Sequence, residues 1–181
     1  MKNKFKNQSG FTLVEMLIAI SLFIAVVTIS IGALLSIFDA NSKAQATKTV
    51  VDNLNLSIEN MTRIVRFGSN YYCGISSNEN SVSNCSGGGN SFSVTFDGSR
   101  IIYRLSGTTI QRSDNGGSYT DITSPETVIQ YLRFYVFGSD TSDSIQPYVI
   151  VVIKGYVGNK PTTQSIFSIE TLMSQRKLDF N

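Results

Sequence analysis

The chain has 181 residues, which is enough for one modest domain beyond an N-terminal segment. It contains no histidine, charged residues make up only 15%, and the formal net charge is +2. Without histidine, the Ser-His and Cys-His pairs of common hydrolases cannot form, and no glycine-rich phosphate loop is present. We therefore expect no catalytic residues and no enzyme activity.

The N-terminus joins a basic leader to a long apolar run. The leader carries Lys2, Lys4 and Lys6 and ends at Gly10, and the apolar run extends over residues 11–38. As a helix, this run would be about 42 Å long, enough to cross a bilayer. A secretory signal has a shorter apolar core, followed by its small-residue cleavage site. Basic residues before the run predict a cytoplasmic N-terminus and an extracytoplasmic remainder.

One acidic residue, Glu15, lies near the start of the apolar run. A carboxylate inside the hydrocarbon is costly, and such residues usually have a function. Two other interpretations remain open. The segment could be an uncleaved anchor in which Glu15 occurs by chance, or Glu15 could extend its carboxylate toward the lipid headgroups.

The segment Gly10-Phe11-Thr12-Leu13-Val14-Glu15 resembles the processing motif of type IV prepilins and pseudopilins. The resemblance implies that a membrane peptidase cuts between Gly10 and Phe11 and methylates the new amine of Phe11. It also implies an assembly role for Glu15, which would meet the Phe11 amine of a neighbouring subunit. The implied partners are the prepilin peptidase/methyltransferase, other pilin or pseudopilin subunits, the inner-membrane assembly platform and membrane lipid.

Loss of the leader would change the charge of the chain. Twelve Lys and Arg would remain against 13 Asp and Glu, a side-chain charge of −1. The basic character therefore comes from the leader, and it gives no support for nucleic acid as a partner.

Beyond the apolar run, the helical pattern continues. Apolar residues recur at spacings of three and four, namely Val51, Leu54, Ile58, Met61 and Val65. Gly68 is a stop signal. We predict one helix over about residues 11–66, with an amphipathic second half that packs on the chain's own sheet rather than on a coiled-coil partner.

The remaining sequence predicts antiparallel strands. Residues 91–96 and 101–105 flank Asp97-Gly98 and predict a hairpin. Further strands are expected at residues 108–112, 128–137, 148–157 and 164–172. The fold class is therefore α+β, a long N-terminal helix on an antiparallel sheet. The expected divisions are leader 1–10, membrane helix 11–38, amphipathic helix 39–68 and β-rich domain 69–181.

The remaining candidate residues are two cysteines and two aspartates. Cys73 and Cys85 lie in the extracytoplasmic part, where a disulfide would close a short loop; two free thiols are the alternative. Asp140 and Asp143 lie in an acidic turn, and calcium would need more oxygen ligands than this turn offers. We therefore predict no metal and no cofactor.

The order of elements resembles minor pilins and the J-class minor pseudopilins of type II secretion. The resemblance implies a structural subunit of a membrane-attached filament at the cell surface or in the periplasm. Two alternatives remain. The chain could be a pilin whose loops, residues 70–90 and 115–124, contact surfaces, DNA or substrate, or it could be a membrane-anchored binding or adhesion domain. The sequence leaves the filament system open.

Overall fold

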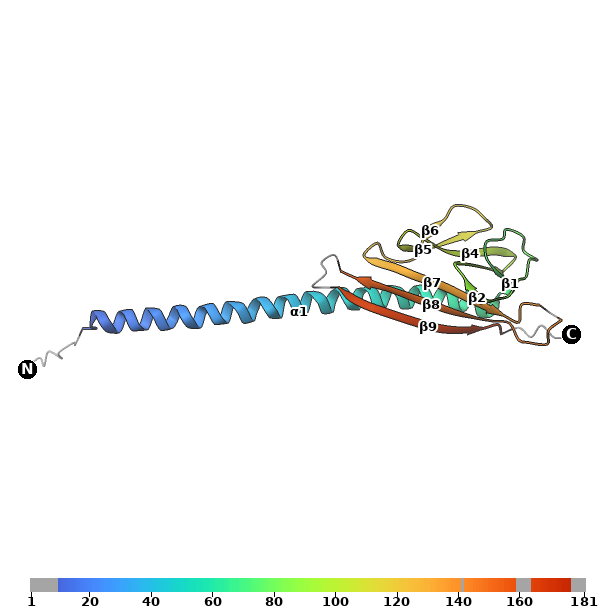
Figure 1. The fold of residues 1–181 in the computed structure, drawn as a ribbon. Coiled ribbons are helices and arrows are strands. Elements are labelled where there is room, and N and C mark those ends of the chain that lie inside the picture. The colour runs from blue at the N-terminus through green and yellow to red at the C-terminus, as the bar shows by residue number, and fades with distance from the viewer. Residues whose placement is uncertain (1–9, 141, 159–163, 177–181) are drawn as a thin grey trace, which may run out of the picture. The chain divides into compact units, whose positions relative to one another are not determined.

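A computed structural model describes residues 10–140, 142–158 and 164–176 of the chain (Figure 1). The expected leader residues Lys2, Lys4 and Lys6 lie outside the described residues. The chain forms two compact units, residues 1–42 and 43–181. Helix α1, Leu13–Phe67, contributes to both units, so its final part belongs with the strands.

The predicted helix is confirmed within two residues at each end. It runs through Gly32 without a break. Its first part has a window of mean hydropathy 2.7 with no residue buried, so by length and composition it can cross a membrane. It ends before Gly68, where any Cβ would overlap the side chain of Val94.

The buried stripe of α1 matches the predicted one at Leu54, Met61 and Val65, but Ile58 is only half-buried and Ile64 is buried although it was not predicted. Val50, Leu54, Met61, Ile64 and Val65 are buried, whereas Val51, expected on this stripe, is 43% exposed. Val50 takes the place of Val51 because it lies four positions before Leu54, close to one helical turn. The side chain of Val51 points about 100° away from that of Val50.

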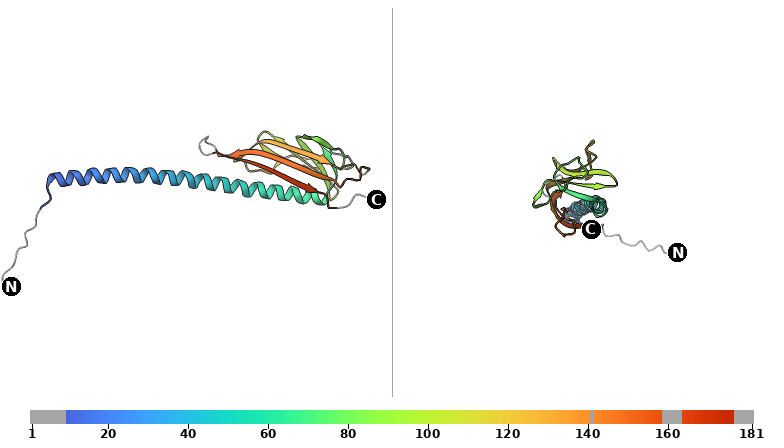
Figure 2. Two further views of the ribbon diagram at one scale, coloured as in Figure 1. Left: turned by 60° about the horizontal axis from the view of Figure 1, so that its bottom comes forward. Right: turned by 90° about the vertical axis from the view of Figure 1, so that its right-hand side faces the viewer.

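The strands form two antiparallel sheets rather than the single sheet expected (Figure 2). The five-stranded sheet has the order β1 (Ser69–Cys73), β3 (Ser91–Phe96), β4 (Ser99–Ser106), β5 (Thr109–Asp114), β6 (Thr120–Asp121). The four-stranded sheet has the order β2 (Cys85–Gly89), β7 (Thr127–Phe137), β8 (Tyr148–Val157), β9 (Ser165–Ser174). The α+β class is confirmed.

Aromatic contacts join the two sheets and the helix in one core. Phe92 of β3 stacks on Phe134 of β7 with ring centroids 5.5 Å apart. Tyr71 of β1 meets Phe92 edge-on at 5.7 Å, and its hydroxyl donates to the carbonyl of Val65 in α1 at 2.6 Å. These three buried rings therefore connect both sheets to α1.

The predicted hairpin is confirmed as β3 and β4. Asp97 and Gly98 both have positive φ, 49° and 69°, as a two-residue turn of this kind requires. Strands β5, β7, β8 and β9 also match the predicted segments within a few residues at each end.

Three strands were not predicted, because residues 70–90 and 115–124 were expected to be loops. Strand β2 has the sequence Cys-Ser-Gly-Gly-Gly, which has little intrinsic strand preference. It forms because β7 supplies its hydrogen bonds, and a Cβ on Gly88 would lie 2.8 Å from the ring of Tyr135. Strands β1 and β6 likewise depend on pairing with neighbours, β3 and β5.

Cys73 and Cys85 form a disulfide with a Cα–Cα distance of 5.8 Å. Cys73 ends β1 and Cys85 begins β2, so the bond links one sheet to the other. The disulfide therefore closes the loop that connects β1 to β2, and neither of these strands was predicted from the sequence.

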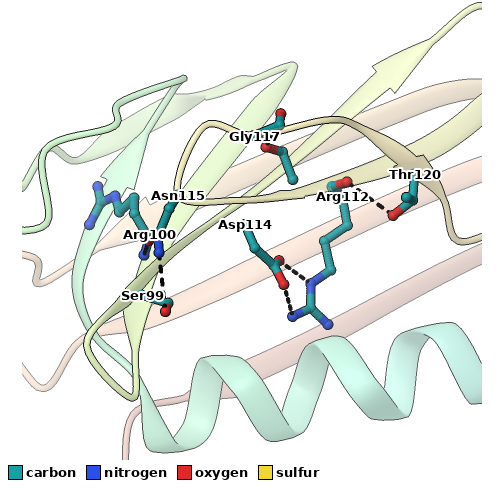
Figure 3. A network of polar contacts seen from close by, with 8 residues as sticks. Ser99, Arg100, Arg112, Asp114, Asn115, Gly117 and Thr120 are labelled. Carbon is teal, nitrogen blue, oxygen red and sulfur yellow. Dashed lines mark hydrogen bonds and ion pairs between the residues drawn. The ribbon is translucent and has the colours of Figure 1, made fainter.

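Polar contacts join the turn that follows β5 to the start of β4 (Figure 3). Asn115 accepts the backbone N–H of Arg100 at 2.6 Å and donates to the hydroxyl of Ser99 at 3.3 Å. Arg112 and Asp114 form an ion pair at 2.8 Å, with the aspartate more than half exposed. The ion pair therefore adds little stability, whereas Asn115 holds the backbone of the turn.

Arg100 is a fully buried cation within the five-stranded sheet. Its guanidinium donates to the carbonyl oxygens of Asn70 at 2.6 Å and Ser81 at 3.1 Å, and to the hydroxyl of Thr95 at 3.0 Å. Nε also donates to the carbonyl of Ser76 at 3.3 Å. Burial lowers the pKa of Arg100. The side chain thus fastens the disulfide-enclosed segment to the sheet.

We expect Arg100→Met to destabilise the β-rich unit by about 3 kcal/mol, because three part-buried carbonyl oxygens and the hydroxyl of Thr95 would lose their donor. Urea unfolding of the full chain in detergent measures this loss. Arg104→Met is the matched control, since Arg104 is partly exposed, donates to Gln111 and should cost about 1 kcal/mol or less. Equal losses in the two variants would contradict the role given to Arg100.

Candidate processing and assembly site

The predicted cleavage point lies just before α1 and is open to solvent. Phe11 is 82% exposed, and a Cβ built on Gly10 meets no atom within 4 Å. The fold of the chain therefore does not require glycine at this position. A requirement for Gly10 would have to come from the enzyme that binds this segment.

Thr12 and Glu15 form a reciprocal cap at the start of α1. The backbone N–H of Thr12 donates to Glu15 Oε2 at 3.0 Å, and the Thr12 hydroxyl donates to the same oxygen at 2.9 Å. The backbone N–H of Glu15 in turn donates to Thr12 Oγ1 at 3.3 Å. This is a capping box, in which two otherwise unpaired N–H groups at a helix start are satisfied.

The cap gives Glu15 a structural role within its own chain. Unpaired N–H groups cost several kcal/mol in hydrocarbon, so a helix that starts at a membrane boundary benefits from a cap. The carboxylate also lies at the positive end of the helix dipole. Sequence analysis identified Glu15 but missed Thr12, although the Thr-x-x-Glu spacing was readable as a capping box.

Asp140 and Asp143 are occupied by local hydrogen bonds. Asp140 Oδ1 accepts from the backbone N–H and hydroxyl of Ser142 at 3.0 and 2.8 Å, which lowers the pKa of Asp140. Asp143 Oδ1 accepts from the backbone N–H of Ile145 at 2.8 Å. Across the described ranges, no group of three or more His, Cys, Asp or Glu side chains could hold a metal ion. The two aspartates shape the turn between β7 and β8.

The N-terminal segment also matches a known family. Residues 5–31 match the family described as the prokaryotic N-terminal methylation motif. The match includes Gly10, Phe11 and Glu15 together with much of the apolar part of α1. It supports a type IV pilin-like or pseudopilin-like structural subunit, processing by a prepilin peptidase, membrane anchoring and assembly with other pilins.

No curated protein and no solved structure matches the chain. The family match ends at residue 31, before the unit formed by residues 43–181. The architecture of that unit therefore rests on the structure itself.

We expect Thr12→Ala to weaken the start of α1 by about 1 kcal/mol, because the two hydrogen bonds of the hydroxyl are lost. Amide hydrogen exchange in detergent micelles should speed up about fivefold over the first helical turn. Thr28→Ala is the matched control, since the hydroxyl of Thr28 donates to Ile24 O in the middle of the same helix. Unchanged exchange in Thr12→Ala would contradict the capping role.

Proposed function

We propose that the chain is a minor pilin or J-class minor pseudopilin, a structural subunit of a type IV pilus or of a type II secretion-like filament. A prepilin peptidase cuts after Gly10 and methylates Phe11. The mature chain then remains in the membrane through residues 11–38 until it joins other subunits, with the N-terminus in the cytoplasm and the β-rich domain outside.

The position of Glu15 is the main support for this proposal. The family match over residues 5–31 places its acidic residue, Glu15, in the first turn of a helix that is apolar enough to span a membrane. A chance acid in a plain anchor would have no reason to occur at this spacing from Gly10 and Phe11.

Glu15 acts in assembly rather than in catalysis. Before assembly, Thr12 supplies its hydrogen bonds within the same chain. In a filament, the amine of Phe11 on a neighbouring subunit brings a positive charge, which stabilises a carboxylate in an apolar setting more strongly than a neutral hydroxyl does. Only a neighbour in the correct axial position can offer this charge, so Glu15 sets the register of the subunits.

Two alternatives place the function in the extracytoplasmic domain. The chain could be an anchored binding or adhesion domain, or a pilin acting in DNA uptake. The 74–84 segment held by Arg100 and the disulfide presents Ile75 and Val82, which are 55% and 43% exposed. A preformed loop of this kind could contact a partner, so loop substitutions rather than Glu15→Ala would impair these functions.

The first test is the intact mass of the full chain, expressed with and without a prepilin peptidase. We expect loss of the first ten residues and gain of one methyl group only when the peptidase is present. Gly10→Ala should abolish or strongly reduce this change without unfolding the chain, because the added methyl meets no neighbour. Glu15→Ala should be cleaved normally but should fail to enter filaments.

An unchanged mass with an active peptidase would overturn the proposal and leave the anchored binding domain. Normal cleavage of Glu15→Ala together with normal filament incorporation would instead refute the assembly role of Glu15 alone. The matched control is Ser21→Ala, which changes a residue of the same helix whose hydroxyl donates to Ile18 O.

A further inference from the structure

The four-stranded sheet has one buried face and one open face. Leu132, Phe134 and Val136 of β7, with Val149 and Val151 of β8, point into the core and are buried. The alternate side chains define the outer face: the odd-numbered residues 131–137 of β7, and the even-numbered residues 148–156 of β8 and 166–172 of β9. Strands β7, β8 and β9 lie side by side in Figure 1.

This outer face is rich in large apolar and aromatic side chains. Ile166 is 86% exposed, Leu172 61% and Tyr131 37%. Ile150 and Val152, on the central strand of the three, are only partly buried. A contiguous apolar face with tyrosines and an arginine has the composition of a protein–protein interface rather than that of an ordinary solvated surface.

The charges of the face are arranged by the strand register. Arg133 pairs with Val152, and Val152 pairs with Glu170, so one row across the sheet reads Arg, Val, Glu. Among the described residues, neither Arg133 nor Glu170 belongs to an ion pair. The positive end of the row lies on β7 and the negative end on β9, with an apolar side chain at its centre.

We propose that the outer face binds the same face of a second copy of this chain. A two-fold axis parallel to the strands and above β8 places β7 of one copy opposite β9 of the other. Arg133 then faces Glu170 of the partner subunit, and Glu170 faces Arg133 of the partner subunit, while the two copies of Val152 meet at the axis. Both ion pairs form by one symmetry operation, as an isologous interface requires.

The other rows fit the same operation. Tyr135, Ile150 and Leu172 share a row, so Tyr135 meets Leu172 of the partner subunit across a central Ile150 pair. Lys154 lies near the axis, but its Nζ leans toward β7 and lies 5.4 Å from the ring centroid of Tyr131. The two lysine side chains therefore point away from each other. Each points toward β9 of the partner subunit, where Glu170 of the partner subunit lies one row away.

The direction of α1 favours this axis over edge-to-edge pairing of β9. Thr47 contacts Ser165 at 2.9 Å near the start of β9, and Arg176, just beyond its end, donates to Arg66 O at 2.7 Å. The helix and β9 therefore run in the same direction. Antiparallel β9–β9 pairing would point the two helices in opposite directions, whereas the proposed axis lets both chains enter the dimer from the same end.

The size of the face predicts a weak dimer. Three strands and five rows cover roughly 14 Å by 27 Å, or about 400 Å² per subunit in projection. Stable interfaces bury about 800 Å² per partner, so this contact lies at the low end. Confinement of both chains to one membrane raises their effective concentration and compensates for a weak contact.

The test uses cysteine cross-linking of the full chain in lipid vesicles. Val152→Cys places a thiol at the proposed axis, and mild oxidation should yield a cross-linked dimer on a non-reducing gel. Thr120→Cys, exposed on the other sheet, is the matched control and should cross-link only at background level. On the Val152→Cys background, Arg133→Glu or Glu170→Arg alone should lower the yield about fivefold, and the two together should restore it.

Three results would overturn the proposal. One is a Val152→Cys yield no higher than that of Thr120→Cys. Another is failure of the combined charge reversal to restore cross-linking when circular dichroism shows that all variants are folded. The third is binding of a labelled single-stranded oligonucleotide by the wild-type chain that Arg133→Glu abolishes with no rescue by Glu170→Arg, since the face would then be a nucleic-acid surface. Glu15→Ala should leave cross-linking unchanged, because the face is independent of the proposed filament role.

Discussion

One helix has to satisfy two different surroundings, and this constraint organises the chain. The first part of α1 has apolar side chains in every direction and none of them buried, whereas from Val50 onward a single stripe is covered by the sheets. A helix that is apolar all round suits lipid, and a one-sided stripe suits the surface of a core. The change between these patterns therefore marks where a membrane segment gives way to a folded domain.

The sequence predicted the elements whose signals are local. The apolar run, the Asp97-Gly98 turn and the alternation along β7 and β8 depend on neighbouring residues, and each was found close to its predicted position. The division of strands into two sheets was missed because it depends on which distant segments pair. Strand β2 is the best example, since its glycines have little intrinsic strand preference. It forms because β7 provides hydrogen-bond partners, and because the ring of Tyr135 lies so close to Gly88 that only glycine fits there.

The candidate site was similarly readable in part. The residues Gly10, Phe11 and Glu15 stand out because their spacing is fixed and because an acid in an apolar run is unusual. The role of Thr12 could also have been predicted, because Thr-x-x-Glu is the spacing of a capping box. It was missed because the same residues belong to the more conspicuous motif that begins at Gly10. Arg100 could not have been found, because most of its acceptors are backbone carbonyls, at residues 70, 76 and 81, and the sequence does not show which backbone groups a side chain will meet.

The shared direction of α1 and β9 has a mechanical consequence. If the chain serves as the proposed filament subunit, tension on its N-terminal helix would act along α1 and therefore along β9. The contacts at Thr47 and Arg66, together with the buried stripe between them, would then be loaded in shear and would have to fail together. A helix crossing the strands at a right angle would instead be peeled away one contact at a time. In the proposed filament role, the arrangement that buries the helix would therefore also resist pulling along α1.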